Sequence, residues 1–195
     1  MSMLKSNMAG ARIAVLAVRN EKIFHIKDLA NLWGITDSHL LRITLSRYVK
    51  NELLYPIYRG FYSLTSIKDC DPLLLGAKAI HTFSYLTLES ILFREGYVSK
   101  KIEDYTFVGE KNKRFSIGEF KFTCRQLNIR FLYNSEGIKQ NNGVMEANAE
   151  RAIADMLYFN PRYHFDRPID WKKIQLMQKK IGYPLTLNRY DTTEG

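Results

Sequence analysis

Hydrogen-bonding side chains recur at helical spacing over residues 36–51. The same stretch carries an apolar stripe at the spacing of one helix face, made by Leu41, Leu45, Tyr48 and Val49. The opposite side holds the polar set: Ser38, His39, Arg42, Ser46 and Lys50, with Arg47 near the border between the faces. A helix with such a face fits the major groove of DNA, where each base pair presents a distinct pattern of donors and acceptors.

The positions within this face predict different contacts. Residues near the start of a groove-entering helix reach base edges, which gives that role to Ser38, His39 and Arg42, with Ser46 one turn later. Arg42 has the donors to pair with a guanine edge. Arg47 and Lys50 are placed for phosphates, which position a protein without reading sequence. Arg59, in the turn of an expected hairpin, could reach a neighbouring groove or the backbone.

The elements expected around this helix are two further helices and a β-hairpin. Apolar spacing predicts helices over residues 3–19 and Ile26–Trp33, the second stopped by Gly34. Thr36 or Asp37 can cap the third helix. Strands are expected at 53–58 and 61–64, joined by Arg59-Gly60, with Pro56 confining the first to a sheet edge. This order predicts a winged helix-turn-helix, a DNA-binding domain, over residues 1–66.

The charge balance favours a polyanionic partner. The 195 residues carry 29 Lys and Arg against 20 Asp and Glu, a net charge of +9. Residues 1–66 hold nine basic and four acidic residues, so a third of the chain supplies five of those nine net charges. The apolar run at 8–18 is too short to span a membrane and contains Arg12. Two cysteines, Cys70 and Cys124, make no disulfide framework, so we expect a cytoplasmic protein without a membrane partner.

Two acidic motifs could support metal-dependent chemistry instead. Glu119-Phe120-Lys121 has the Glu-x-Lys form of metal-dependent nucleases, and Asp104 could supply an earlier carboxylate. Asp69-Cys70-Asp71 has nucleotidyltransferase spacing, but it lacks a preceding Gly-Ser and Pro72 follows it, so we interpret it as a linker. The histidines and cysteines show no zinc-ligand spacing, and neither a phosphate-binding glycine loop nor a catalytic nucleophile motif is present. We therefore expect no cofactor, no metal site and no enzyme activity.

The remainder of the chain predicts an α+β domain over residues 71–195, after a junction at Ser66–Pro72. Two basic groups in it could contact DNA or an acidic partner: Lys111, Lys113 and Arg114 in an expected hairpin loop, and Lys172, Lys173, Lys179 and Lys180 on the last helix. A solvated face is the preferred interpretation of both. The expected helices are 73–81, 86–95, 148–159 and 171–181, and the expected strands are 105–108, 115–117, 120–123 and 129–133.

Several segments together resemble a known family. They are Gly60-Phe61-Tyr62-Ser63-Leu64, Asp71-Pro72, the stretch YLTLESIL at 85–92 with Gly96, and AERAIADMLY at 149–158. In this order and spacing they resemble the AbiEi antitoxins of bacterial and archaeal type IV toxin–antitoxin systems. The resemblance runs from about residue 23 to residue 159, and it departs from the family at His25, where a Ser or Thr cap is usual.

The resemblance implies a winged helix-turn-helix that represses its own operon by binding inverted repeats in the promoter. It also implies a C-terminal domain that counters a nucleotidyltransferase toxin without forming a stable complex with it. Four residues match the family's polar helix positions: Glu89, Glu150, Arg151 and Asp155. They form either a small functional site or, as we prefer, a structural set in which Arg151 pairs with a carboxylate and ties two helices together.

The sequence thus predicts a DNA-binding repressor that is also an antitoxin. Two alternatives stay open. One is a nuclease that a winged helix delivers to DNA, and the other is a protein-interaction module with no role on DNA.

Overall fold

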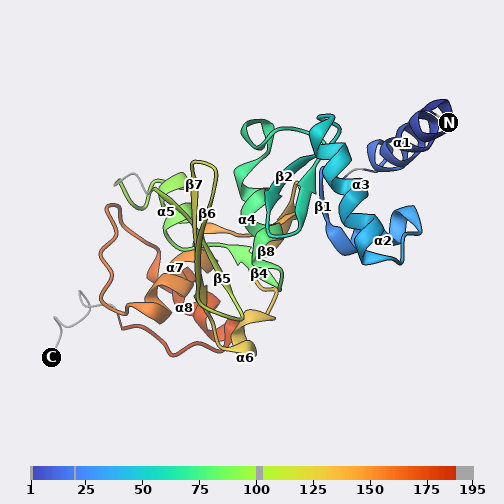
Figure 1. The fold of residues 1–195 in the computed structure, drawn as a ribbon. Coiled ribbons are helices and arrows are strands. Elements are labelled where there is room, and N and C mark those ends of the chain that lie inside the picture. The colour runs from blue at the N-terminus through green and yellow to red at the C-terminus, as the bar shows by residue number, and fades with distance from the viewer. Residues whose placement is uncertain (1, 20, 100–102, 188–195) are drawn as a thin grey trace, which may run out of the picture. The chain divides into compact units, whose positions relative to one another are not determined.

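The computed structural model describes residues 2–19, 21–99 and 103–187, and for residues 2–7 only the backbone (Figure 1). The chain divides into two compact units, Met1–Asp71 and Pro72–Gly195. The division falls at the Asp71-Pro72 step. Both units combine helices with β-sheet, so the chain has the mixed α+β character that the sequence predicts.

The first unit combines three helices with a small antiparallel sheet of strand order β1-β3-β2. Pro56 lies on β2, an edge strand, where its missing N–H leaves no ladder bond unmade. The short β1 was not predicted from the sequence, because a strand of three residues is too short to show alternation. The elements are α1 (Ser2–Ala17), β1 (Ile23–His25), α2 (Ile26–Trp33), α3 (Ser38–Lys50), β2 (Tyr55–Tyr58), β3 (Phe61–Ser63) and a 3₁₀ turn at Ile67–Asp69.

Capping interactions fix the two helices α2 and α3 relative to the turn between them. Gly34 ends α2 at φ 62°, a conformation open to glycine, and Asp37 caps α3 by accepting from the backbone N–H of His39 at 2.7 Å. His25 serves as the α2 cap in place of Ser or Thr. Its Nδ1 accepts from the Lys27 N–H at 3.3 Å, while Asp28 accepts from the His25 N–H at 3.2 Å.

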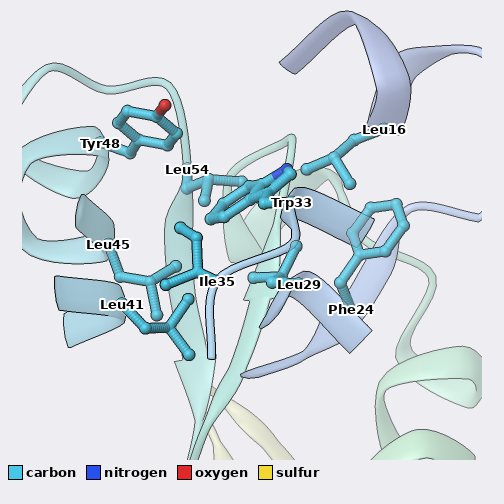
Figure 2. Packing of buried hydrophobic residues seen from close by; sticks show 9 residues of the cluster. All are labelled: Leu16, Phe24, Leu29, Trp33, Ile35, Leu41, Leu45, Tyr48 and Leu54. Atoms are coloured by element: carbon cyan, nitrogen blue, oxygen red, sulfur yellow. The ribbon is translucent and has the colours of Figure 1, made fainter. Parts of the chain in front are cut away.

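A single apolar core holds the helices of the first unit on their sheet (Figure 2). Leu41 and Leu45 of α3 lie beside Ile35, which follows the helix-ending glycine, and Trp33 lies between Leu16 and Leu54. Trp33 also donates from its indole N–H to the Arg12 carbonyl at 3.2 Å, which ties α2 to α1. The buried side chains of α3 therefore fix which of its faces remains exposed.

The second unit is built on a six-stranded mixed sheet of order β6-β7-β5-β4-β9-β8. Its strands are β4 (Ser84–Leu86), β5 (Asp104–Gly109), β6 (Lys113–Ile117), β7 (Phe120–Gln126), β8 (Ile138–Asn141) and β9 (Val144–Ala147). Its helices are α4 (Pro72–Ile80), α5 (Glu89–Arg94), α6 (Ile129–Leu132), α7 (Ala149–Phe159) and α8 (Trp171–Ile181).

Helices cover both faces of this sheet (Figure 1). A Cβ added to Gly76 of α4 would lie 3.0 Å from Phe107 and 2.5 Å from Phe122, so α4 packs closely on the face that these rings share. Thr106, which precedes Phe107 on β5, points to the other face of the sheet. Its backbone N–H donates to the Ser90 hydroxyl of α5 at 2.7 Å, and its own hydroxyl oxygen accepts from the Ser90 N–H at 2.9 Å. Helix α7 packs against α5 and α8.

Two secondary-structure predictions for this unit were wrong, and one hairpin was not predicted. Residues 129–132 form α6 instead of a strand, with Tyr133 as the C-cap, because Asn128 caps the helix start and because the adjacent Phe131 and Leu132 are both buried. The helix expected at 86–95 starts only at Glu89, since Leu86 belongs to β4. The β8–β9 hairpin was missed.

The prediction that Lys111, Lys113 and Arg114 share one hairpin loop was also wrong. Lys113 and Arg114 lie in β6, and only Lys111 lies in the connection before it. The Lys113 ammonium donates to the Ala79 carbonyl at 2.6 Å, so this cation holds β6 to the end of α4. Lys180 on α8 pairs with Glu136 at 2.6 Å.

Candidate nucleic-acid interface

The outward face of α3 is polar, basic and free of carboxylates. The α3 residues predicted to contact DNA are all exposed: Ser38, His39, Arg42, Ser46, Arg47 and Lys50. Leu40, which the sequence analysis did not single out, shares this face and is 50% exposed. Between Ser38 and Lys50 the helix contains no Asp or Glu. This face is therefore a hydrogen-bonding surface with positive charge that also carries one exposed apolar side chain, Leu40.

The opposite face of α3 is anchored in the core. Leu41, Leu45 and Tyr48 are buried as expected, and Thr44 is buried with them. The Thr44 hydroxyl donates to the Leu40 carbonyl one turn earlier at 2.8 Å, so this polar group is satisfied within the helix. A buried threonine on a helix has no sequence signal that separates it from an exposed one.

The basic side chains on this face of α3 are not engaged in ion pairs with other described residues. Within the described part of the chain, Arg42, Arg47 and Lys50 form no ion pair. Arg59, the seventh predicted residue, lies apart from α3 on the β2–β3 turn, exposed, with its guanidinium 5.5 Å from the ring of Tyr58. The geometry thus brings six of the predicted residues onto one helix face and puts the last on a hairpin tip. All four side chains keep their charge available for an external anion such as a phosphate.

The second candidate group, around Arg151, is a closed structural network. The Arg151 and Asp155 side chains are 0% exposed and pair within α7, at 2.9 Å between Nε and Oδ1. The other Arg151 donors reach the carbonyls of Asn134, Glu136 and Phe131 at 2.9–3.1 Å and the Tyr85 hydroxyl at 2.6 Å. Every guanidinium N–H therefore has an acceptor.

Asp155 is equally saturated. Its carboxylate accepts from the hydroxyls of Tyr183 at 2.6 Å, Thr87 at 2.8 Å and Tyr85 at 3.0 Å, in addition to Arg151. Burial, reinforced by the nearby Asp155 charge, raises the pKa of both Tyr85 and Tyr183, so these hydroxyls stay protonated and keep donating. With all donors and acceptors used internally, the network leaves no group for a substrate.

The structural interpretation of this polar set holds for Arg151, which pairs with a carboxylate and ties α7 to α6 through the Phe131 carbonyl. That carboxylate, of Asp155, lies on the same helix, and Arg151 also ties α7 to β4 and to the loop after α6. Glu89 is elsewhere, paired with Arg125 at 2.6 Å, and Glu150 lies half-buried outside the network. The four residues therefore form no common site.

The nuclease-like residues line one cavity but not in the expected geometry. Asp104, Glu119 and Lys121 border an open cavity of about 720 Å³. Glu119 falls in the turn before β7, so it does not share a strand face with Lys121, whose ammonium pairs with Glu103 at 2.6 Å. Asp104 accepts from Thr123 at 2.8 Å. Among the described residues no group of three His, Cys, Asp or Glu side chains is placed to hold a metal ion.

The Asp69-Cys70-Asp71 segment connects β3 with α4. Asp69 closes a 3₁₀ turn and accepts from the Ser66 hydroxyl at 2.7 Å. The Cys70 thiol is buried and lies 3.4 Å from the Ser63 hydroxyl. These contacts fit the linker interpretation.

Comparisons with known proteins do not place the chain in a family. No protein-family model matches it, and no curated protein is significantly similar to it. Among the described residues, none of the helices has the length and apolar character that crossing a membrane requires.

Proposed function

We propose that this protein binds double-stranded DNA through a winged helix-turn-helix in its first unit. The order of helix, strand, two helices and a two-stranded hairpin, with the first strand completing the sheet, supports this proposal. In this arrangement α3 is the recognition helix, and the β2–β3 hairpin with Arg59 at its tip is the wing.

The observation that carries the proposal is the acid-free outer face of α3. Its three cations have no ionic partner among the described residues, while the buried side chains opposite fix the helix orientation. A helix prepared in this way loses little conformational freedom when it enters a groove. Arg47 and Lys50 neutralise phosphates and so supply binding affinity. Arg42, His39 and Ser38 contact base edges and so supply sequence specificity.

The AbiEi resemblance extends this proposal to a biological role. The protein would repress its own operon by binding inverted repeats, and its second unit would counter a nucleotidyltransferase toxin without a stable complex. Co-expression with a nucleotidyltransferase encoded beside its gene tests this extension, and an unchanged growth arrest would exclude the antitoxin role.

Fluorescence anisotropy with the DNA upstream of its own gene tests the DNA-binding proposal. We expect binding that weakens steeply between low and physiological salt, because released counterions drive it. The triple variant Arg42→Ala, Arg47→Ala, Lys50→Ala should lose binding, whereas Lys139→Ala, an exposed cation on β8, should retain it. Absence of binding to this DNA would support the protein-interaction alternative instead, and equal losses in both variants would contradict the role of α3.

A further inference from the structure

The connection between α7 and α8 has the features of a binding loop. Residues 160–170 contain no helix or strand, and the connection is longer than the roughly 2–8 residues usual between packed helices. Its centre reads Pro161-Arg162-Tyr163-His164-Phe165-Asp166-Arg167-Pro168. We call residues 161–168 the aromatic-basic loop.

Contacts with the segment after α5 hold this loop in place. The Asp166 N–H donates to the Tyr97 carbonyl at 2.9 Å, and the Asp166 carboxylate accepts from the Ser99 N–H. The Arg167 guanidinium lies 4.3 Å from the Tyr97 ring and donates to the Glu95 carbonyl at 3.0 Å. The loop is therefore shaped before any ligand arrives, which lowers the entropy lost on binding.

The anchored loop borders an open cavity of about 600 Å³. Half-buried aromatic rings and exposed guanidinium groups line it together: Tyr163, Phe165 and Trp171 with Arg162 and Arg167, and the exposed imidazole of His164 lies among them. The one carboxylate of the loop, Asp166, is engaged by Ser99. Arg162 forms no ion pair with any carboxylate in the described part of the chain. The cavity thus offers flat apolar surfaces beside uncompensated positive charge.

We propose that this cavity binds a nucleotide unit, with its base against the aromatic rings and its phosphate at Arg162 and Arg167. Aromatic side chains stack on any base, and guanidinium groups form charge-assisted hydrogen bonds to phosphate oxygens. The unit can be a free nucleotide or part of a single strand, since both present the same chemistry. This site is separate in sequence from α3 and does not depend on duplex binding by the first unit.

Trp171 gives a direct readout of occupancy. The full chain carrying Arg42→Ala, Arg47→Ala and Lys50→Ala is titrated with AMP, UMP, single-stranded hexanucleotides of RNA and DNA, and inorganic phosphate. We expect saturable quenching of tryptophan fluorescence by the nucleotides or the strands. The same titration of a Trp171→Phe variant should show none, because the remaining Trp33 lies in the core of the first unit.

Two variants test the assigned contacts. Arg162→Ala and Phe165→Leu should each weaken binding about fivefold or more, from a lost phosphate contact and lost stacking. Lys139→Ala removes an exposed cation elsewhere on the same unit and should leave the affinity unchanged. Arg162 is exposed, so its variant tests the site even where Phe165→Leu perturbs folding.

Each result of these titrations either supports or overturns the proposed nucleotide site. Tighter binding of hexanucleotides than of mononucleotides supports a strand as ligand, and equal binding supports a free nucleotide. Absence of quenching, equal binding of inorganic phosphate, or equal weakening by Lys139→Ala overturns the proposal. Because the α3 cations are already removed in this background, the result stands apart from that of the duplex-binding assay.

Discussion

Removal of the Arg151 side chain tests whether the buried network holds the second unit together. Arg151→Met keeps an unbranched side chain of similar length but removes five hydrogen bonds, of which one pairs the guanidinium with Asp155. The Asp155 carboxylate would then be buried without a counter-charge, with only three hydroxyl donors. Leaving one member of a buried ion pair unpaired costs about 3–5 kcal/mol.

Thermal and urea unfolding of the full chain measure this loss. For a unit of this size, 3–5 kcal/mol lowers the melting temperature by about 12–19 °C. Lys139→Met, at an exposed position on β8, is the matched control and should change the free energy of unfolding by less than about 0.5 kcal/mol. The double variant Arg151→Met, Asp155→Leu should be less destabilised than Arg151→Met alone, because no charge is then left buried. An Arg151→Met protein within about 1 kcal/mol of wild type would refute the reasoning.

Four further outcomes follow from single features. Gly34→Ala should lose about 1 kcal/mol in urea unfolding, all of it backbone strain at φ 62°, since no atom lies within 4 Å of the added Cβ. The raised pKa of Tyr85 and Tyr183 means that the unfolded chain ionises first, so the urea midpoint should fall as pH rises above about 10, and less steeply in Tyr183→Phe. Burial raises the pKa of the Cys124 thiol to about 11, so iodoacetamide at neutral pH should modify Cys124 only after unfolding, as mass spectrometry would show. Plasmid incubated with Mg²⁺ should stay intact; cleavage that Glu119→Ala abolishes would revive the nuclease alternative.

The first unit was the more predictable part of the chain because its signals are local. Gly34 and Asp37 mark the end of one helix and the start of the next, and both act as the sequence indicates. The exposed side of α3 also follows from periodicity, because a helix with one apolar stripe must present its other side to solvent.

The second unit departed from expectation where long-range contacts decide. Residues 129–133 look like an apolar strand in the sequence. In the structure the Phe131 carbonyl accepts a hydrogen bond from the Arg151 guanidinium, a partner that is distant in sequence. The Asn142-Gly143 pair at the β8–β9 turn is the local sequence signal for the unexpected hairpin, and both residues have positive φ. Asp155 lies four residues after Arg151, so spacing shows that pair. The pairing of Glu89 with Arg125 and of Arg151 with Tyr85 could not be read from spacing, because Arg125 and Tyr85 lie on strands of the sheet.

Competition binding with Arg42→Ala and Lys50→Ala tests the central claim that α3 enters the major groove. Each variant is titrated on the DNA upstream of its own gene and on random duplex of equal length and salt. A base contact from Arg42 predicts a loss of about 1–3 kcal/mol on the specific site and little on random DNA, while Lys50→Ala weakens both alike. Equal losses of Arg42→Ala on both duplexes, or no loss on either, would contradict the placement of α3 in the groove.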